Sequence, residues 1–207
     1  MSVRDAYNTW AASYDSDRNL TRDLDQQVTR ATLGGLQPGA ILELGCGTGK
    51  NTAFLAQMGV PVHALDFSEG MLQQARAKVP QAHVTFTVAD LAALWPCANQ
   101  AVDLVVCNLV LEHIADLAHI FAEAARCLRP SGHFFISELH PFKQYLGSKA
   151  VFQQDQETVT IPAFVHHISE FCAGAAAMGF TLSRLQEWWH SEDEQTPPRL
   201  VSFLFEK

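Results

Sequence analysis

The chain has 207 residues, of which 48% are hydrophobic and 17% are charged. That balance excludes an intrinsically disordered protein, because disordered chains combine low hydrophobicity with high charge. The length fits one domain whose core forms without disulfides or a structural metal. The formal net charge of −8 disfavours a nucleic-acid partner, since proteins that bind polyanions carry a basic patch or stripe.

Cysteine usage and apolar runs indicate the compartment. The five cysteines are scattered and form no C-x-x-C pair, which is typical of reduced thiols and argues against a disulfide framework or a zinc ribbon. We therefore predict no metal site. The N-terminal stretch lacks the apolar core of a signal peptide, and no apolar run approaches the ~20 residues of a membrane span. We expect a cytoplasmic protein without membrane contact.

Short apolar runs alternate with helix-like stretches through most of the chain. The periodicity predicts strands and intervening helices. The strands are expected at 41–44, 60–65, 84–88, 102–107 and 133–137, and the helices at 51–57, 68–78 and 116–128. Short strands that alternate with helices form βαβ units with right-handed crossovers and a parallel sheet covered on both faces. The fold class is therefore α/β, doubly wound and Rossmann-like.

Two segments depart from this alternation. Residues 1–30 read as one or two helices, and residues 138–167 read as irregular, with a hairpin near 152–161. We expect both segments to lie over the open ends of the strands as a lid, so that the second forms an insertion after the fifth strand.

The C-terminal part adds one helix and two strands. The helix is expected over 169–178, because Gly179 stands where a helix commonly stops. The strands are expected over 180–188 and 200–205, which gives a mostly parallel sheet of seven strands.

A glycine-rich loop follows the first predicted strand and reads Glu43-Leu44-Gly45-Cys46-Gly47-Thr48-Gly49. Glycines at a strand-to-helix turn permit positive φ and let the backbone approach a ligand closely. A tight turn without a ligand is one alternative. A P-loop is excluded, because Gly49-Lys50 is followed by Asn51 and position 44 is a leucine. A dinucleotide fingerprint, G-x-G-x-x-G, is one residue longer than this G-x-G-x-G loop.

The remaining pattern, E/D-x-G-x-G-x-G, is typical of proteins that bind S-adenosylmethionine (SAM). Here the chain resembles the class I SAM-dependent methyltransferases, in particular their small type 11 methyltransferase-domain group. The resemblance spans roughly residues 35–140, and its motifs occur in the family's order. They are ILELGCGTG, VHALDFSEGML, VTFTVADLAAL, VDLVVCNLVLEHI and FAEAARCLRPSGHFFIS.

The resemblance implies a domain organisation. Residues 1–207 form a single methyltransferase domain that combines four parts. These are a helical lid over 1–30, a SAM-binding half over 35–140, an acceptor-side insertion over 141–167, and a last helix and strands over 168–207.

The resemblance also assigns the cofactor site. It implies that Asp66 receives both ribose hydroxyls, and that Asp90 accepts a hydrogen bond from the adenine amine. Taken singly, Asp66 also fits an NAD ribose or a solvated turn, and Asp90 also fits a helix N-cap. The full set of implied cofactor residues is Tyr14, Glu43, Gly45, Cys46, Gly47, Gly49, Asp66, Phe67, Met71, Asp90, Leu91, Asn108 and Leu109.

The acceptor side is less determined, because methyl transfer needs orientation more than a catalytic side chain. A general base, where one is used, contributes about 10²–10⁴-fold. The candidates for catalysis or acceptor contact are His140, His166, His167 and Tyr145. Tyr7 is a second aromatic candidate over the cofactor, beside Tyr14. His113 reads as a packed residue near the amino-acid end of the cofactor. Phe152 and Phe164 are candidates for an apolar acceptor pocket.

Three functions compete. The leading one is a SAM-dependent methyltransferase that acts on an O or N atom of a small-molecule acceptor and releases S-adenosylhomocysteine (SAH). A non-catalytic SAM-binding regulator and, less favoured, an NAD-dependent oxidoreductase are the alternatives. The acidic charge and the absence of an N/D-P-P-Y/F element at positions 107–110 disfavour DNA or RNA as acceptor. We expect a monomer or a homodimer.

Overall fold

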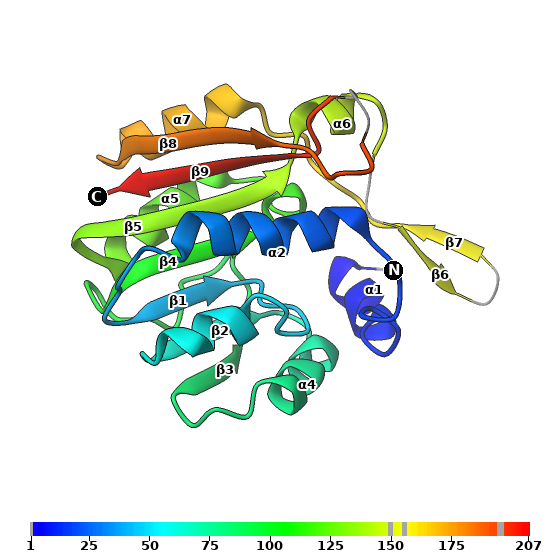
Figure 1. The fold of residues 1–207 in the computed structure, drawn as a ribbon, viewed down its shortest axis with the longest axis horizontal. Coiled ribbons are helices and arrows are strands. Elements are labelled where there is room, and N and C mark those ends of the chain that lie inside the picture. Colours follow the sequence, from blue (N-terminus) through cyan, green and yellow to red (C-terminus); the bar gives the residue numbers. More distant parts are fainter. Residues whose placement is uncertain (1, 149–150, 155–156, 194–196) are drawn as a thin grey trace.

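The computed structural model describes residues 2–148, 151–154, 157–193 and 197–207. Its centre is a seven-stranded sheet with the strand order β3-β2-β1-β4-β5-β9-β8 (Figure 1). The strands are β1 Ile41–Leu44, β2 Val62–Asp66, β3 Val84–Val88, β4 Val102–Asn108, β5 Leu128–Leu139, β8 Thr181–Trp188 and β9 Leu200–Glu206. The predicted α/β, doubly wound sheet of seven strands is confirmed.

The sheet is parallel from β3 to β5 and antiparallel at its last two strands. β1 pairs in parallel with both β2 and β4, and β9 lies antiparallel between β5 and β8. All four residues of β1 are buried, as expected for a central parallel strand covered on both faces. The carboxyl ends of the parallel strands therefore meet at one edge, which Figure 1 shows facing α1.

Helices flank this sheet on both faces and beyond the strand ends. They are α1 Val3–Trp10, α2 Leu20–Leu33, α3 Thr52–Leu55, α4 Glu69–Lys78, α5 Leu117–Cys127, α6 Pro141–Tyr145 and α7 Ile168–Ala177, with 3-10 turns η1 Ala56–Met58 and η2 Leu111–His113. On one face, Phe121 of α5 and Phe171 of α7 belong to the same core cluster as Phe134 and Phe203 of the sheet. One part of the hydrophobic core thus lies between this face of the sheet and helices α5 and α7.

The lid prediction is wrong for the second N-terminal helix. Residues Leu24, Val28 and Leu33 of α2 are buried in a core cluster with Leu104 and Phe135 of the sheet. An apolar stripe at this helical spacing buries against the sheet, so α2 is a covering layer of the fold. Only α1, seen beyond the strand ends in Figure 1, lies where the lid was expected.

The segment after β5 is more regular than the sequence indicated. His140 accepts a hydrogen bond at the start of α6, a short helix that was not predicted. The predicted hairpin exists, as β6 Val151–Gln154 paired antiparallel with β7 Glu157–Thr160. β5 begins at Leu128, five residues before the predicted start, because the chain enters the sheet directly from the end of α5.

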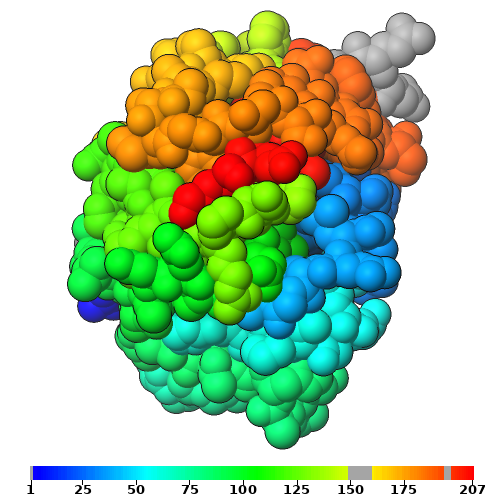
Figure 2. Space-filling view, turned by 90° about the vertical axis from the view of Figure 1, so that its left-hand side faces the viewer, coloured from blue at the N-terminus to red at the C-terminus, as the bar shows by residue number. Residues whose placement is uncertain are grey.

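At the end of the sheet opposite the carboxyl ends of the parallel strands, the chain's last strand ends between β5 and β8. Figure 2 shows the end of β9 in red beside the yellow-green of β5 and near the blue of α2. Lys207 fastens it, because its Nζ donates to the carbonyl oxygens of Ala125 and Leu128. Within the described ranges, no helix has both the length and the apolar character needed to cross a membrane.

Candidate functional site

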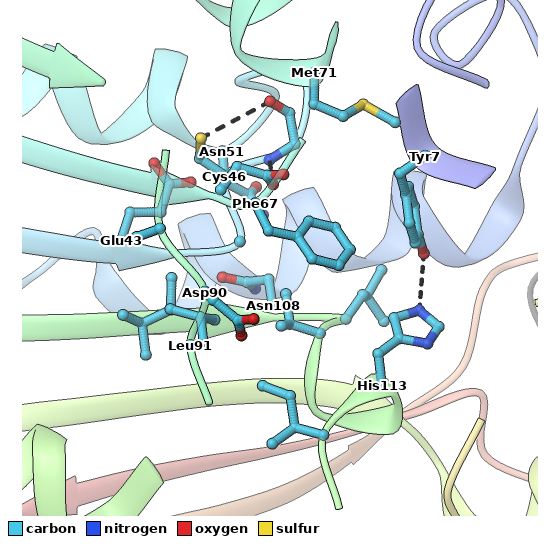
Figure 3. Close-up of a pocket in the computed structure, with 18 of the residues that line it drawn as sticks. Tyr7, Glu43, Cys46, Asn51, Phe67, Met71, Asp90, Leu91, Asn108 and His113 are labelled. Carbon is cyan, nitrogen blue, oxygen red and sulfur yellow. Dashed lines mark hydrogen bonds between the residues drawn. The ribbon is translucent and has the colours of Figure 1, made fainter. Parts of the chain in front are cut away.

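A cavity of about 520 Å³ opens at the carboxyl ends of β1, β2 and β4. Ligands of open α/β sheets bind at this place, in the crevice outside the strand ends. The volume falls within the range of about 300–1,000 Å³ that is usual for small-molecule sites. Figure 3 shows the cavity with Glu43 and Leu91 toward one side and Tyr7 and His113 toward the other.

The glycine loop forms one wall with left-handed backbone. Gly45 and Gly47 have φ of +65° and +54°, a region that favours glycine. A Cβ on Gly45 would lie 2.1 Å from Cγ2 of Val110, so no side chain fits there. A Cβ on Gly47 would meet no atom within 4 Å, so the backbone of this residue is open to an approaching ligand. The loop therefore leaves open backbone at the cavity, beside Gly47.

Asp66, the last residue of β2, joins the loop to the next helix. Its Oδ2 accepts from the backbone N–H of Gly47 at 2.8 Å, and its Oδ1 accepts from that of Ser68 at 2.9 Å. Burial raises the pKa of Asp66 to about 6, although these backbone donors lower it. A carboxylate held in this way keeps lone pairs for further donors at the cavity.

Two more buried acids line the cavity. Glu43 accepts from the hydroxyl of Thr52 at 2.6 Å, and burial raises the pKa of Glu43 to about 8. Asp25 of α2 accepts from the amides of Asn51 and Asn108, both at 2.8 Å. Asp25 thus fixes the orientation of Asn108 at the end of β4, and the sequence analysis did not single it out.

The wall next to β3 carries Asp90 and Leu91. Asp90 accepts from the backbone N–H of Ala92 at 3.0 Å, and its other oxygen lies 3.6 Å from the guanidinium of Arg4. Leu91 and Met71 are buried. Figure 3 shows Phe67 projecting between the glycine loop and Tyr7. These side chains bound a mostly apolar slot with one carboxylate at its rim.

The structure gathers nearly all predicted cofactor residues around this one cavity. Those that line it are Tyr14, Glu43, Gly45, Cys46, Gly47, Asp66, Phe67, Met71, Asp90, Leu91, Asn108 and Leu109. Gly49 is the exception. It has φ of +80°, and a Cβ there would lie 3.2 Å from Ala75 of α4, so this glycine permits close packing between the loop and α4.

The predicted acceptor residues do not line the cavity. His140 caps α6: its Nδ1 accepts from the N–H of Phe142 at 3.1 Å, and its Nε2 lies 2.9 Å from Glu187 of β8. Both ring nitrogens therefore have partners outside the cavity. The strand end does bring His140 to the correct edge of the sheet, but the turn into α6 directs the ring toward β8.

The other three predicted residues also lie elsewhere. His166 is buried, with Nε2 2.7 Å from the carbonyl oxygen of Ile114 and its ring edge-on to Phe171. His167 and Tyr145 are exposed and hydrogen-bond to each other. They belong to the outer surface of α6 and α7. Phe164 does line the cavity as predicted, whereas the side chain of Phe152 lies outside the described residues.

A different pair faces the cavity on this side. Tyr7 comes from α1 and His113 from η2, and the Tyr7 hydroxyl lies 2.9 Å from Nε2 of His113 (Figure 3). Nδ1 of His113 lies 3.1 Å from the carbonyl oxygen of Pro162. Both residues were noted from the sequence, but neither was assigned a chemical role. Their pairing could not be predicted, because it joins segments 106 residues apart.

Glu138, near the end of β5, holds the turn that carries His113. One of its oxygens accepts from the N–H groups of Val110 and Leu111, both at 2.9 Å. Burial raises the pKa of Glu138 to about 8. The signal for this residue was available, because it is an acid at a predicted strand end, as Asp66 and Asp90 are.

Comparisons with known proteins decide the family. The profile of the family described as "Methyltransferase domain" matches residues 42–136. A malonyl-[acyl-carrier protein] O-methyltransferase from Pseudescherichia vulneris is 34% identical over 131 residues, 63% of this chain and 51% of that protein. The chain belongs to the SAM-dependent methyltransferases. It falls in their type 11 group, as the sequence motifs predicted.

Solved structures of methyltransferases share the fold. A SAM-dependent methyltransferase from Mesorhizobium loti superposes with a TM-score of 0.74 at 22% identity, over 91% of this chain and 100% of that one. The N-methyltransferase NodS from Bradyrhizobium japonicum, solved with SAH, gives 0.75 at 16% identity, over 100% and 99%. Because the chain belongs to the SAM-dependent methyltransferases, its cofactor is SAM. The chain spans 33% to 58% of the length of the first curated relatives that it matches.

Proposed function

We propose that this methyltransferase transfers the methyl group of SAM to an O or N atom of a small-molecule acceptor. The observation that carries the proposal is that one cavity contains both the cofactor wall and a second, weakly charged wall with Tyr7, His113 and Phe164. When bound, SAM supplies an activated methyl group, and the protein contributes binding and orientation.

The residues present fit the cofactor. Asp66 offers a carboxylate to the ribose hydroxyls, and Gly47 offers open backbone to the methionine part. Asp90 and Leu91 bound the slot proposed for adenine, with Asp90 as acceptor for the exocyclic amine. Tyr14, from the segment after α1, closes this side of the cavity and is proposed to cover the cofactor.

The charges around the cavity favour an acceptor without a carboxylate or phosphate. Among the described residues that line it, the lysines and arginines are Arg22 and Lys50. Arg22 donates to the carbonyl oxygens of Tyr14 and Asp17, and Lys50 pairs with Asp23. Since each cation already has a partner, a small uncharged acceptor meets the lower desolvation cost. The same charges speak against nucleic acid.

The open cavity also supports catalysis over regulation. A regulator that only senses SAM needs no space beyond the cofactor, and side chains would fill the acceptor end. Here the cavity continues to Ile114, His119 and Phe164. The loop spacing in turn supports SAM over NAD, because the third glycine comes one residue too early for the dinucleotide fingerprint.

A second candidate acceptor comes from the sequence relatives. Several of them, at 31–34% identity, are malonyl-[acyl-carrier protein] O-methyltransferases. On that ground, a malonyl thioester is the second candidate acceptor. The hydrogen bonds of Arg22 and Lys50 weigh against it, because the carboxylate of such an acceptor would compete with Asp23 for Lys50 and with two backbone carbonyls for Arg22.

Thermal unfolding with SAM, SAH and NAD tests the cofactor first. A ligand at a hundred times its Kd adds about 2.7 kcal/mol of stability, so SAM and SAH should raise Tm clearly. A shift with NAD and none with SAM or SAH would refute the proposal.

The acceptor is then sought by measuring SAH release in the presence of SAM and a panel of candidate acceptors. The panel contains neutral alcohols, phenols and amines, with malonyl-loaded acyl carrier protein as a separate arm. Turnover of small acceptors supports the proposal. Turnover of the malonyl arm alone would replace it by the second candidate.

A further inference from the structure

The Tyr7–His113 pair has a defined direction of hydrogen bonding. The carbonyl oxygen of Pro162 can only accept, so Nδ1 of His113, 3.1 Å away, carries the proton. In the neutral ring Nε2 is then the acceptor, and the Tyr7 hydroxyl donates to it over 2.9 Å. Because its own proton is directed to Nε2, the Tyr7 oxygen is left as an acceptor at the cavity.

The surroundings keep Tyr7 a neutral phenol until a proton moves. Burial raises the pKa of Tyr7 well above its usual range, and the neighbouring Tyr14, Glu112, Asp66 and Glu138 raise this pKa further. Tyr7 therefore does not act as a free phenolate. It can accept a proton only while it passes its own to His113.

His113 is placed to receive that proton. Oε1 of Glu112 lies 3.7 Å from Nε2 of His113, and both side chains are at least 90% buried. The proton would therefore arrive beside an acidic side chain, at a place from which water is largely excluded. The carbonyl of Pro162 fixes the ring from the other side, so proton uptake requires no rotation.

From this geometry we infer that Tyr7 and His113 form a proton relay for a neutral hydroxyl acceptor, an alcohol or a phenol. The inference rests on the proposed methyl transfer.

The reaction step moves one proton along the pair. As the acceptor oxygen bonds to the methyl carbon, the carbon–sulfur bond breaks and its electron pair stays on sulfur. The acceptor's proton passes to Oη of Tyr7, and the Tyr7 proton passes to Nε2 of His113. The imidazolium then releases it to water. Tyr7 is the catalytic residue, and His113, acting through it, is the positioning residue.

The same cavity wall indicates that the acceptor is an alcohol or a phenol. An oxygen nucleophile gains from losing its proton during transfer, and a base is worth about 10²–10⁴-fold for that step. Carbon side chains of Phe164, Ile114 and Val110 line the cavity beside the pair, which suits an uncharged acceptor body.

Two variants of the full chain test the relay. Tyr7→Phe removes the hydroxyl, and His113→Gln keeps an acceptor for it but takes up no proton. With neutral phenols and alcohols as probes and SAH release as readout, both should lower kcat by about 10²-fold or more. Both should leave the Kd for SAH within about twofold, as measured by calorimetry. His63→Gln, which removes a histidine bonded to Thr87 away from the cavity, is the matched control and should retain wild-type kcat.

The pH profile and the imidazole resonances separate a relay from a structural role. At saturating SAM, so that protonation of Asp66 does not limit binding, wild-type kcat should fall on acidification, because Nε2 accepts the Tyr7 proton only while it carries none. This fall should be absent in His113→Gln. Nitrogen NMR of the SAH-bound protein should show His113 as the Nδ1–H tautomer, with an Nε2 resonance that moves in Tyr7→Phe. The His113→Gln spectrum assigns the signal.

The outcomes of these experiments distinguish failure of the proposed function from failure of the proton relay. If SAH does not bind, the proposed function fails. If SAH binds and both variants retain kcat within about threefold, the relay is wrong while the proposed function stands. If no probe is methylated, the tautomer decides: an Nε2–H form of His113 overturns the relay, and an Nδ1–H form coupled to Tyr7 supports it.

Discussion

The two walls of the cavity are assembled differently. The cofactor wall comes mostly from neighbouring strand ends, and Asp66 is bonded to the adjacent glycine loop through Gly47. The acceptor wall combines α1, η2 and the segment before α7, and it is held by contacts between residues 49 and 106 positions apart. The order of the parallel strands thus places most of the first wall, whereas the second exists only when three distant segments meet.

Loss of the Asp66 carboxylate should have the largest effect on the cofactor wall. Asp66→Ala removes two charge-assisted hydrogen bonds to the proposed ribose diol, worth about 1.5–3 kcal/mol each. We expect SAM affinity to fall by at least about 10²-fold in calorimetry. Glu192→Ala, which removes a surface partner of Arg18, serves as the control. Unchanged affinity in Asp66→Ala would show that the ribose lies elsewhere.

The same residue makes binding depend on pH. Because burial raises the pKa of Asp66 to about 6, the carboxyl gains a proton as the pH falls below that value and loses acceptor capacity. SAM affinity should therefore weaken between pH 7 and pH 5 (about one unit on either side of that value). Asp66→Asn, which cannot ionise, should bind weakly with a flatter pH dependence.

Gly45 tests whether the loop tolerates a side chain at all. Gly45→Ala combines a left-handed φ of +65° with a Cβ 2.1 Å from Val110. The expected loss in the free energy of unfolding is about 2–4 kcal/mol, from backbone strain and overpacking together. Gly59 is the matched control, because its φ is +73° but a Cβ there meets no atom within 4 Å. Gly59→Ala should cost only the strain, about 1–2 kcal/mol. Equal losses in urea denaturation would contradict the steric argument.

The sequence could predict the first wall because periodicity places strand ends. Asp66, Asp90 and Asn108 each stand where an apolar run stops, so their meeting at one edge follows from a parallel sheet. Gly49 shows the limit within a motif: it has the right spacing, yet it packs on α4. Spacing predicts position along the chain, whereas contact depends on which element covers the residue.

The second wall could not be predicted in the same way. His140 follows a strand end, but its ring turns to Glu187 of β8, 47 residues later, and nothing in the local sequence indicates that partner. Tyr7 and His113 meet only because α1 folds over η2. His166 and His167 were candidates because they precede the last predicted helix, but the fold buries His166 against Ile114 and leaves His167 on the surface.

Glu43 connects the cofactor wall to stability. Burial raises the pKa of Glu43 to about 8, so the folded protein keeps a proton that the unfolded chain, with a carboxyl pKa of about 4.3, has released. Stability should consequently fall as the pH rises between those two values. Glu43→Gln should reduce this fall but not abolish it, because the pKa of Glu138 is also raised to about 8. Urea denaturation near pH 4.3 and near pH 8 measures this fall in stability, and Glu69→Gln, at an exposed position, is the control. An identical slope in Glu43→Gln and wild type would show that Glu43 is ionised in the folded protein.

The smallest effect on stability is expected from substitution of His140, which lies beside the acceptor wall. His140→Ala removes the cap of α6 and the bond to Glu187, so the free energy of unfolding should fall by about 0.5–2 kcal/mol. His140→Asn keeps a capping acceptor and should lose less. Because the ring does not line the cavity, turnover and SAM affinity should stay at wild-type values in both variants. A selective loss of turnover at full stability would return His140 to the acceptor side, and it would mean that α6 moves toward the cavity when the acceptor binds.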